Sequence, residues 1–453
     1  MADATADKAR FLTGSTMHHV IVMTLTGSAG LVFMFLVDVA TLFWVSKLGV
    51  ERYMAALGFA WTIQFFTIST GIGLMIASMA LISRAVGQGK LGLARRQTST
   101  ALVYNLMLQI IIAASVVSFR HEILGFAGAQ GETATFAARY LLISVPSLPF
   151  IALGMIASAV LRSIGDAYRS MFVTMSAGLV AMIVDPFLIF TMELGYEGAA
   201  WGVVISRATS AFIGLWFAWR THDMMGRIHL EDLKTLFKPF AAIAIPAMAT
   251  QLATPFGNYI LTRVISSYGD GAVAGWAVVS RVAVLAFGGI FSLSGAIGGI
   301  IGQNYGAGQL DRVRQTFVDS LIFCGVYTAI CWAILALFRH QIVWIFGLED
   351  VAADVLFAFL LVGSSAYVFS GAIFVSNAAF NNLGRPLNST WCNWLRDGVL
   401  MLPCTYLLGL WLAAPGVVYG QALAAVVVGF IAVYWAWRYL QNLQPLTAEP
   451  LAS

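Results

Sequence analysis

The chain has 453 residues, of which 60% are hydrophobic and 10% are charged, and its formal net charge is +4. Soluble domains carry roughly 25% charged residues, so this composition excludes a soluble protein and indicates one that lies in a membrane. Apolar stretches of about 20 residues or more recur along the chain, and each could cross a hydrocarbon core of about 30 Å. Because these stretches lack the period-2 alternation of barrel strands, we predict an all-α polytopic membrane protein.

The apolar stretches predict about twelve transmembrane helices. The polar residues before the first stretch, Met1 to Thr16, are followed by no small-residue cleavage site, so we expect no cleaved signal peptide. In chain order the predicted spans are roughly 17–46, 53–82, 94–119, 132–160, 168–191, 195–219, 237–266, 272–301, 313–338, 350–380, 388–411 and 414–440.

Lysine and arginine residues are distributed unevenly over the connections between spans. Sixteen lie on the side that holds both termini, including Arg84, Lys90 and Arg162, and six lie on the opposite side, including Arg120 and Arg339. Basic residues concentrate on the cytoplasmic side of membrane proteins. We therefore expect both termini in the cytoplasm and the protein in the plasma membrane, which in bacteria is the inner membrane. The small positive charge reflects this bias and indicates no nucleic-acid partner.

The chain contains an internal duplication. Gly87-Gln-Gly89 recurs as Gly306-Ala-Gly308 at an offset of 219 residues, and the same offset places Gly165 on Gly384. Each half then contains six spans with the same orientation, so we expect the halves to be related by an axis along the membrane normal.

Three segments follow from this duplication. We predict an N-terminal lobe at 1–219 with the first six spans and a C-terminal lobe at 237–453 with the other six. The basic segment 220–236 between them is predicted to be a cytoplasmic linker with a short surface helix.

Two aspartates lie inside the apolar stretches of the first half. Asp38 is in the first span, and Asp185 is in the fifth, directly before Pro186. An ionised carboxylate at the centre of a bilayer costs several kcal/mol, so such a residue usually faces water or a partner and serves a function. The repeat offset places Asp38 on Gly257, and an offset two residues shorter places Asp185 on Leu402. The fold therefore does not need these acids for packing, and we predict that they bind and release a coupling cation.

These residues resemble a known family, the multidrug and toxic compound extrusion (MATE) family. The resemblance covers nearly the whole chain and implies a V-shaped pair of six-helix bundles around a central cleft. It also implies cation-coupled export of drug-like, often cationic, compounds, with the coupling ions on the acids of the first and fifth spans. Besides Asp38, the matching segments are Gly71-Ile-Gly73, Arg84 to Gly89, Asp185 to Phe190, Gly198-Ala-Ala200, Ser280-Arg281 and Ile301 to Gly308.

Two departures from the family pattern bear on the coupling ion. In the NorM-type branch, acids in the seventh and tenth spans contribute to a sodium site, but residues 247–254 and 364–380 contain none, which places this chain closer to the DinF-type branch. Some relatives in that branch have an asparagine and a threonine near the fifth-span acid, where this chain has Ala181 and Val203. Sodium prefers several oxygen ligands, whereas a proton needs one carboxylate. We therefore expect proton coupling, with Na⁺ as the alternative, and no bound metal or other cofactor.

Polar and soft apolar side chains inside the spans are candidates for contact with a substrate. Thioethers adapt to different shapes, and aromatic rings attract cations. The candidates are Met34, Phe35, Gln64, Phe65, Asn105, Met175 and Met182. The alternative for the two amides is an interhelical hydrogen bond, which is the common use of such groups in bundles. Arg207 could pair with an acid whose identity the sequence leaves open, and Arg396 with Asp397 could be a structural ion pair.

Other functions fit the sequence less well. A flippase for lipid-linked saccharides from the same superfamily usually has a more cationic cleft, and the paired acids argue against it. No motif of an intramembrane protease and no repeated filter sequence of a channel is present. We therefore predict a monomeric multidrug efflux antiporter, not an enzyme, that confers drug resistance and whose partners are drug-like small molecules and membrane lipids.

Overall fold

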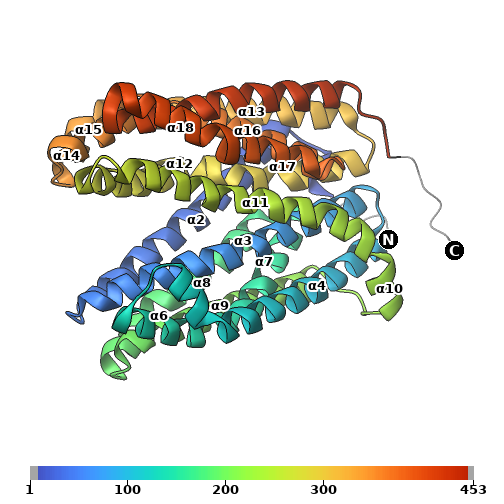
Figure 1. Ribbon diagram of the computed structural model, residues 1–453. Helices are drawn as coiled ribbons and strands as arrows, with labels where there is room; N and C mark the ends of the chain where they lie inside the picture. The colour runs from blue at the N-terminus through green and yellow to red at the C-terminus, as the bar shows by residue number, and fades with distance from the viewer. Residues whose placement is uncertain (1–8, 447–453) are drawn as a thin grey trace.

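The computed structural model describes residues 9–446, and every regular element in that part of the chain is a helix (Figure 1). The first half contains η1 (Arg10–Leu12), α2 (Thr16–Ser46), α3 (Glu51–Gly87), α4 (Leu91–Ser118), α5 (Arg120–Phe126), α6 (Gly131–Ser144), η2 (Val145–Ser147), α7 (Leu148–Ser163), α8 (Ala167–Pro186), η3 (Phe187–Thr191), α9 (Gly195–Trp216) and η4 (Phe217–Thr221). The second half contains α10 (Leu230–Thr235), α11 (Phe237–Ser266), α12 (Asp270–Gly306), α13 (Leu310–Leu337), α14 (Arg339–Ile345), α15 (Asp350–Ala358), η5 (Phe359–Gly363), α16 (Tyr367–Asn382), α17 (Pro386–Trp394), η6 (Leu395–Leu400) and α18 (Met401–Gln441). The predicted all-α fold is confirmed.

Ten helical segments among these residues are long and apolar enough to cross a membrane, and the bent pair of α15–η5 with α16 makes an eleventh. The last of the ten, Pro386–Gln441, has 56 residues. At 1.5 Å per residue it would be about 84 Å long, far more than one crossing needs. Ala413 in its middle has a φ of 54°. A Cβ on Gly420 would lie 2.4 Å from Thr405 Cα, so the chain reverses direction between these two residues. The segment is two spans, which agrees with the predicted twelve.

The duplication is visible in the bounds of the helices. An offset of 219 residues carries α3 onto α12, α4 onto α13 and α5 onto α14, each from its first residue to its last. Turn residues recur in the same way: φ is 73° at Gly89 and 74° at Gly308, and 81° at Gly165 and 88° at Gly384. The 3₁₀ turn η2 in the first half corresponds to the 60° bend between η5 and α16. Backbone geometry therefore repeats where the side chains differ.

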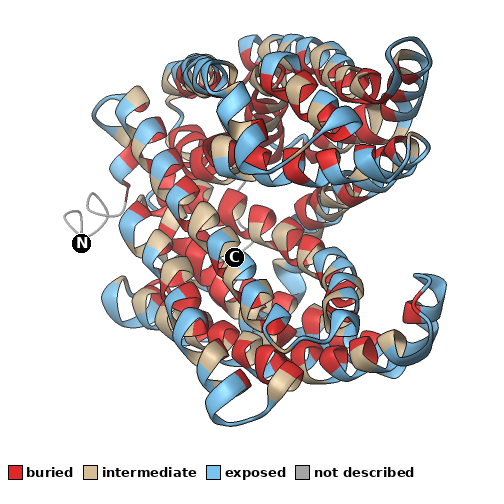
Figure 2. Ribbon diagram, turned by 90° about the vertical axis from the view of Figure 1, so that its left-hand side faces the viewer, coloured by how far each residue is buried: buried red, intermediate tan, exposed pale blue. Residues whose placement is uncertain are grey.

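The two six-helix bundles meet at one end and diverge toward the other (Figure 1). The end where they meet also carries α10 and is called the α10 end below. Several helices contact both bundles; for example, α2 packs against α12 as well as α8, and α11 packs against α3 as well as α17. Buried residues fill the inside of each bundle and the region where the bundles meet, and exposed residues cover the outer faces (Figure 2).

The segment between the two halves lies along α4. Ser99 Oγ donates to Gly226 O at 2.8 Å, and Tyr104 Oη donates to Leu233 O at 2.7 Å. Asp232, inside the six-residue helix α10, accepts from Arg96 at 3.1 Å. The predicted short helix of the linker is therefore present and is fixed to the first half by hydrogen bonds.

The helices α3 and α12 contact each other through residues that are equivalent in the repeat. A Cβ on Gly302 would lie 1.8 Å from Ser83 Oγ. A Cβ on Gly306 would lie 2.2 Å from a backbone oxygen of α3, and one on Gly87 would lie 2.0 Å from a backbone oxygen of α12. The offset of 219 relates Ser83 to Gly302. It also relates Gly87 to Gly306. The contact therefore lies on the pseudo-twofold axis, and equivalent residues of α3 and α12 make the same approach on each side of it. Small residues at this spacing let two helix backbones approach closely.

A second pair of equivalent residues ties the bundles together beside this crossing. Arg84 Nε donates to Asn382 O at 2.9 Å, at the C-terminal end of α16. Gln303 Nε2 donates to Ser163 O at 2.6 Å, at the C-terminal end of α7. The offset relates Arg84 to Gln303, and it relates Ser163 to Asn382. Each bundle thus provides a donor for a carbonyl at a helix end of the other, where the helix itself has no N–H to offer.

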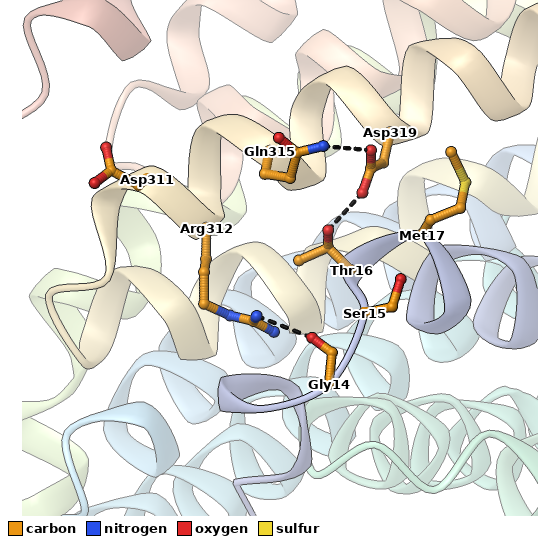
Figure 3. A pocket seen from close by; sticks show the side chains of 8 residues that line it. All are labelled: Gly14, Ser15, Thr16, Met17, Asp311, Arg312, Gln315 and Asp319. Carbon is orange, nitrogen blue, oxygen red and sulfur yellow. Dashed lines mark hydrogen bonds between the residues drawn. The ribbon is translucent and has the colours of Figure 1, made fainter.

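The residues just before α2 lie against α13 of the second half (Figure 3). Arg312 donates to Gly14 O at 3.0 Å. Thr16 donates to Asp319, which also accepts from Gln315 at 2.7 Å. These side chains line an open groove of about 510 Å³. The start of the first span is therefore bound by hydrogen bonds to the second bundle.

The close approach of α3 and α12 can be tested with Gly87→Ala. Its Cβ would collide with the α12 backbone, so we expect the bundles to separate at the α10 end. Spin labels on cysteines introduced at the exposed positions Lys90 and Asp311 should report a longer distance. Gly92→Ala is the matched control, because a Cβ there meets nothing within 4 Å and alanine favours a helix over glycine by about 1 kcal/mol. An unchanged distance in Gly87→Ala would contradict the prediction.

Candidate functional site

The structure places Asp185 of α8 against α2, one helical turn from Asp38. Thr41, one turn after Asp38 on α2, donates a hydrogen bond from its hydroxyl to Asp185 Oδ2. Residues three apart share a helix face, so Asp38 and Thr41 point the same way. Asp38 is exposed, whereas only 2% of Asp185 is accessible. Asp38 is therefore accessible, and Asp185 lies inside the first bundle, hydrogen-bonded to a hydroxyl one turn from Asp38 on α2.

Asp185 Oδ1 is buried and has no hydrogen-bond partner in the part of the chain that the structure describes. It lies against Gly202 of α9, where a Cβ would be 1.9 Å from it. Leaving a buried carboxylate oxygen unpaired costs free energy. This oxygen is thus a place where a proton or a cation would be stabilised. Thr41 and Gly202 were missed in the sequence, although Gly202 follows Gly198 by one turn and Thr41 follows Asp38 by one turn.

Ala181, one turn before Asp185, is buried and offers no side-chain oxygen. After Pro186 the chain continues without interruption as the π-helix η3. Proline lacks an N–H, so a change in hydrogen-bond pattern is the ordinary response to it. The fifth span is therefore continuous past its acid, with an altered turn directly after it.

Arg207 on α9 is the third charged side chain of this region, and only 8% of it is accessible. Its guanidinium donates to Ser144 O at 3.0 Å, to Ser147 Oγ at 2.9 Å and to Gln64 Oε1. All three acceptors are neutral, and no carboxylate among residues 9–446 lies within ion-pair distance of it. Arg207, which the sequence left free to pair with an acid, is therefore held by hydrogen bonds to three neutral groups.

The candidate substrate residues fall into two groups. Phe65 is 46% exposed and Met182 is 36% exposed, and Met34, Phe35 and Met175 are half-buried. These five side chains remain accessible, so their predicted role in substrate contact stays a prediction.

Gln64 and Asn105 are buried inside the first bundle. Gln64 accepts from Arg207 and donates to Ser144 Oγ at 3.2 Å. Asn105 donates to Ala152 O at 3.4 Å. Both amides therefore make interhelical hydrogen bonds, which was the alternative role named for them. Their predicted contact with a substrate stays a prediction.

The start of α8, the helix that carries Asp185, is fixed by a charged cluster at the α10 end. Asp166 caps the helix by accepting from Arg169 N at 3.1 Å, and it pairs with Arg169 Nη1 at 2.6 Å and with His222 Nε2 at 2.8 Å. Burial alone would raise the pKa of Asp166, but the hydrogen bonds from His222 and Arg169 outweigh it and hold that pKa well below its usual value. Asp166 thus stays ionised and joins the fifth span to the end of the sixth.

The second half has no acid at the positions equivalent to Asp38 and Asp185. A Cβ on Gly420, near the equivalent of Gly202, would contact Cys404 O at 2.5 Å. The offset of 219 relates the starts of α8 and α17 and carries Asp185 to Cys404, whereas the shifted alignment gives Leu402, and neither residue is an acid.

The second bundle contains a different buried charge pair. Arg396 Nε and Nη2 donate to the two carboxylate oxygens of Asp397 at 2.7 and 2.8 Å. Both residues lie in η6 and are buried. Asp397 packs against Gly257, the equivalent of Asp38, where a Cβ would be 2.8 Å from Asp397 Cβ. The Arg396–Asp397 ion pair named as a possibility in the sequence is therefore present.

Within residues 9–446 no cluster of three or more His, Cys, Asp or Glu side chains could hold a metal ion. A sequence model of the MatE family matches residues 28–187 and 246–407, once in each half. This chain belongs to the MATE family. The family consists of membrane transporters, so the chain is a transporter and not an enzyme, as predicted.

Known proteins resemble this MATE transporter over almost its whole length. The FAD transporter of Shewanella oneidensis is 25% identical over 435 residues, 95% of this chain and 96% of the relative. The multidrug export protein MepA of Staphylococcus haemolyticus is 24% identical over 387 residues, 84% of this chain and 85% of the relative. A crystal structure of a mutant of the Vibrio cholerae MATE transporter VcmN has a TM-score of 0.90 at 24% identity, covering 94% of this chain and 98% of that one. The last likeness concerns the fold alone.

Gly202→Ala tests the packing around Asp185. The added methyl group would displace the carboxylate from Thr41, so we expect transport to fall about tenfold or more, the rate equivalent of about 1.4 kcal/mol. Initial rates of uptake into proteoliposomes are the measurement. Gly58→Ala in α3 is the matched control, because a Cβ there meets nothing within 4 Å. Equal rates for the two variants would contradict the proposed packing.

Proposed function

We propose that this MATE transporter is a proton-coupled antiporter that exports lipophilic, often cationic, compounds by alternating access. The observation that carries the proposal is the unpartnered, buried Oδ1 of Asp185, connected through Thr41 to the helix turn that bears the exposed Asp38. A carboxylate in such a place favours binding a positive species, because burial penalises its free charge. A proton and a cationic substrate can each supply that positive charge, and competition between them gives exchange.

The surroundings of Asp185 favour a proton over Na⁺ as the coupling ion. Hard metal cations take several oxygen ligands. Here Asp185 has one hydroxyl neighbour, Thr41, while Ala181 and Gly202 offer no side-chain oxygen. A proton needs a single carboxylate oxygen. Sodium coupling remains the alternative that a sodium gradient would reveal.

The substrates follow from the accessible side chains and from the relatives. Phe65 and Met182 are exposed, and Met34, Phe35 and Met175 are half-buried. Thioethers and aromatic rings can contact flat lipophilic cations of many shapes. The Staphylococcus relative is a multidrug export protein, which supports small drug-like compounds as the cargo.

A second substrate class is the flavin nucleotides. The Shewanella relative is an FAD transporter, and its likeness to this chain extends over 95% of the residues. FAD is anionic. Its export would use the same cation site for coupling, but FAD would not compete with the coupling cation for the carboxylate as a cationic substrate does. A transport assay with both kinds of compound separates the two.

In the proposed transport cycle the α10 end lies in the cytoplasm, because most lysine and arginine residues of the connections between spans are at that end. With the bundles closed at that end and diverging at the other, a proton entering from outside neutralises the acid pair and releases the substrate. The loaded protein then opens at the α10 end, where the proton leaves. In this proposal one chain suffices for the cycle, in a bacterial inner membrane.

Asp38→Asn and Asp185→Asn test the coupling site. Each variant removes a carboxylate that must take up the cation, so we expect uptake of ethidium into proteoliposomes under an imposed pH gradient to fall to the level of empty vesicles. Asp354→Asn is the matched control, since Asp354 is exposed on α15. A parallel assay with FAD identifies the substrate class, and a sodium gradient without a pH gradient identifies the ion. Wild-type uptake by both variants would exclude the proposal.

A further inference from the structure

A short segment before the first span lies across both bundles at the α10 end. Residues 9–14, called the N-terminal strap below, contain the turn η1 and lead into α2. Only 2% of Phe11 and 8% of Ala9 are accessible, so these two side chains are packed into the protein. The proposed transport cycle opens the α10 end. The strap must then leave at least one of the two bundles.

The backbone of the strap is hydrogen-bonded to the second bundle. Phe11 N donates to Gln303 Oε1 at 3.0 Å, and Asn304 Nδ2 donates to Phe11 O at 3.3 Å. Arg312 donates to the same carbonyl at 2.8 Å and to Gly14 O at 3.0 Å (Figure 3). Asn304 Oδ1 also accepts from Arg312 Nε at 3.0 Å, which fixes the guanidinium. Side chains of α12 and α13 therefore bind both polar backbone groups of Phe11.

The ring of Phe11 lies between one glycine of each bundle. Gly165, in the turn between α7 and α8, has a φ of 81°, and a Cβ there would lie 3.3 Å from Phe11 Cε1 and Cζ. A Cβ on Gly299 of α12 would lie 3.2 Å from Phe11 Cε2. Ala9 belongs to an apolar cluster built mainly from α3, α4 and α7, and Leu12 packs against that cluster. The strap therefore reaches the first bundle through van der Waals contacts of its side chains.

The internal repeat shows that the fold does not require this insertion. The offset of 219 residues places Phe11 on Leu230, which begins α10. Leu230 is 78% exposed. The linker around it is hydrogen-bonded to α4, and the strap is hydrogen-bonded to α13, the equivalent of α4. Each lead-in segment thus binds the same helix of the opposite half, but Phe11 is inserted between the bundles and Leu230 is not.

We propose that the N-terminal strap moves with the second bundle and holds the transporter closed at the α10 end, with Phe11 leaving Gly165 when that end opens. Separating the strap from the second bundle would leave polar groups of Phe11, Asn304 and Arg312 without partners, which is costly. Separating Phe11 from Gly165 breaks van der Waals contacts and costs only in proportion to the apolar area exposed. The inference rests on the proposed function, because that cycle opens the α10 end.

Phe11 thereby sets the balance between the closed and the open α10 end. In the closed state its ring is covered from both sides. In the open state the edge that faced Gly165 meets water, so the buried ring favours closure. A smaller side chain removes most of this difference and shifts the equilibrium toward the open state.

Phe11→Ala tests this balance through a distance. Spin labels at Lys90 and Gln441, exposed residues of the first and second bundles at the α10 end, report the separation of the bundles. We expect the variant to gain a population with a longer distance than the wild type shows in pulsed electron paramagnetic resonance. The labels are attached to introduced cysteines, in a background where alanine replaces the native cysteines Cys324, Cys331, Cys392 and Cys404.

The matched control is Phe317→Ala. Phe317 is equally buried, but its ring stacks on Trp437 inside the second bundle. This variant loses a ring of the same size without touching the strap, so its distance distribution should match that of the wild type. An unchanged distribution in Phe11→Ala, or the same change in Phe317→Ala, would overturn the proposal. If Phe11→Ala does not fold, Phe11→Leu should give a smaller shift in the same direction.

A disulfide between the strap and the first bundle tests which bundle the strap follows. A Cβ on Gly165 would lie 3.1 Å from Arg10 Cβ, near the separation of about 3.5–4.5 Å in a disulfide. Arg10→Cys with Gly165→Cys should therefore crosslink on oxidation. Uptake of ethidium under a pH gradient should then fall to the level of empty vesicles and return on reduction. Gly165→Cys alone has the same strain at a positive φ and should not respond to the oxidant.

The two measurements separate the strap from the proposed function. A wild type that accumulates neither ethidium nor FAD under any pH or sodium gradient excludes the proposed function, and the label distances then decide on the strap, since they need no transport. A coupled wild type whose oxidised Arg10→Cys, Gly165→Cys variant is fully crosslinked and keeps its uptake excludes the strap alone.

Discussion

The crossing of α3 and α12 at Ser83 and Gly302 is the contact on which the arrangement of the two bundles depends. Lipid tails are as apolar as the helices, so helices in a membrane associate through close packing and hydrogen bonds. Here the absence of side chains at Gly87, Gly302 and Gly306 lets the backbones approach within van der Waals contact. The contact lies on the pseudo-twofold axis, and the bundles diverge away from it. The space between them therefore opens only at the end far from α10.

Against this symmetric frame, the charges are asymmetric. The first bundle combines two acids with one arginine, and the second pairs one acid with one arginine in contact. The same position serves both arrangements: Asp38 in the first half is Gly257 in the second, and the space left by that glycine is taken by Asp397. A duplicated scaffold thus carries the two candidate coupling acids in one copy and a neutral ion pair in the other.

The sequence was sufficient to predict the fold, because apolar stretches and repeated glycines record helices and turns directly. Twelve spans, the offset of 219 and the short linker helix followed from these patterns. The sequence was insufficient to predict the hydrogen-bond partners of the charged groups. Nothing local marks Ser144 or Ser147 as acceptors for Arg207, since these contacts join residues at least 60 positions apart.

The two exchanged donors at the α10 end, Arg84 and Gln303, make separation of the bundles cooperative. Each donor occupies a carbonyl of the opposite bundle, and the two are related by the pseudo-twofold axis, so one rigid rotation breaks both. A half-separated state would leave one buried carbonyl unsatisfied, at a cost of about 1–3 kcal/mol, while the other bond still restrained the rotation. This cost makes the separation of the bundles a two-state transition. The protein therefore spends little time in partly separated states, which limits the passive leak of protons between the bundles.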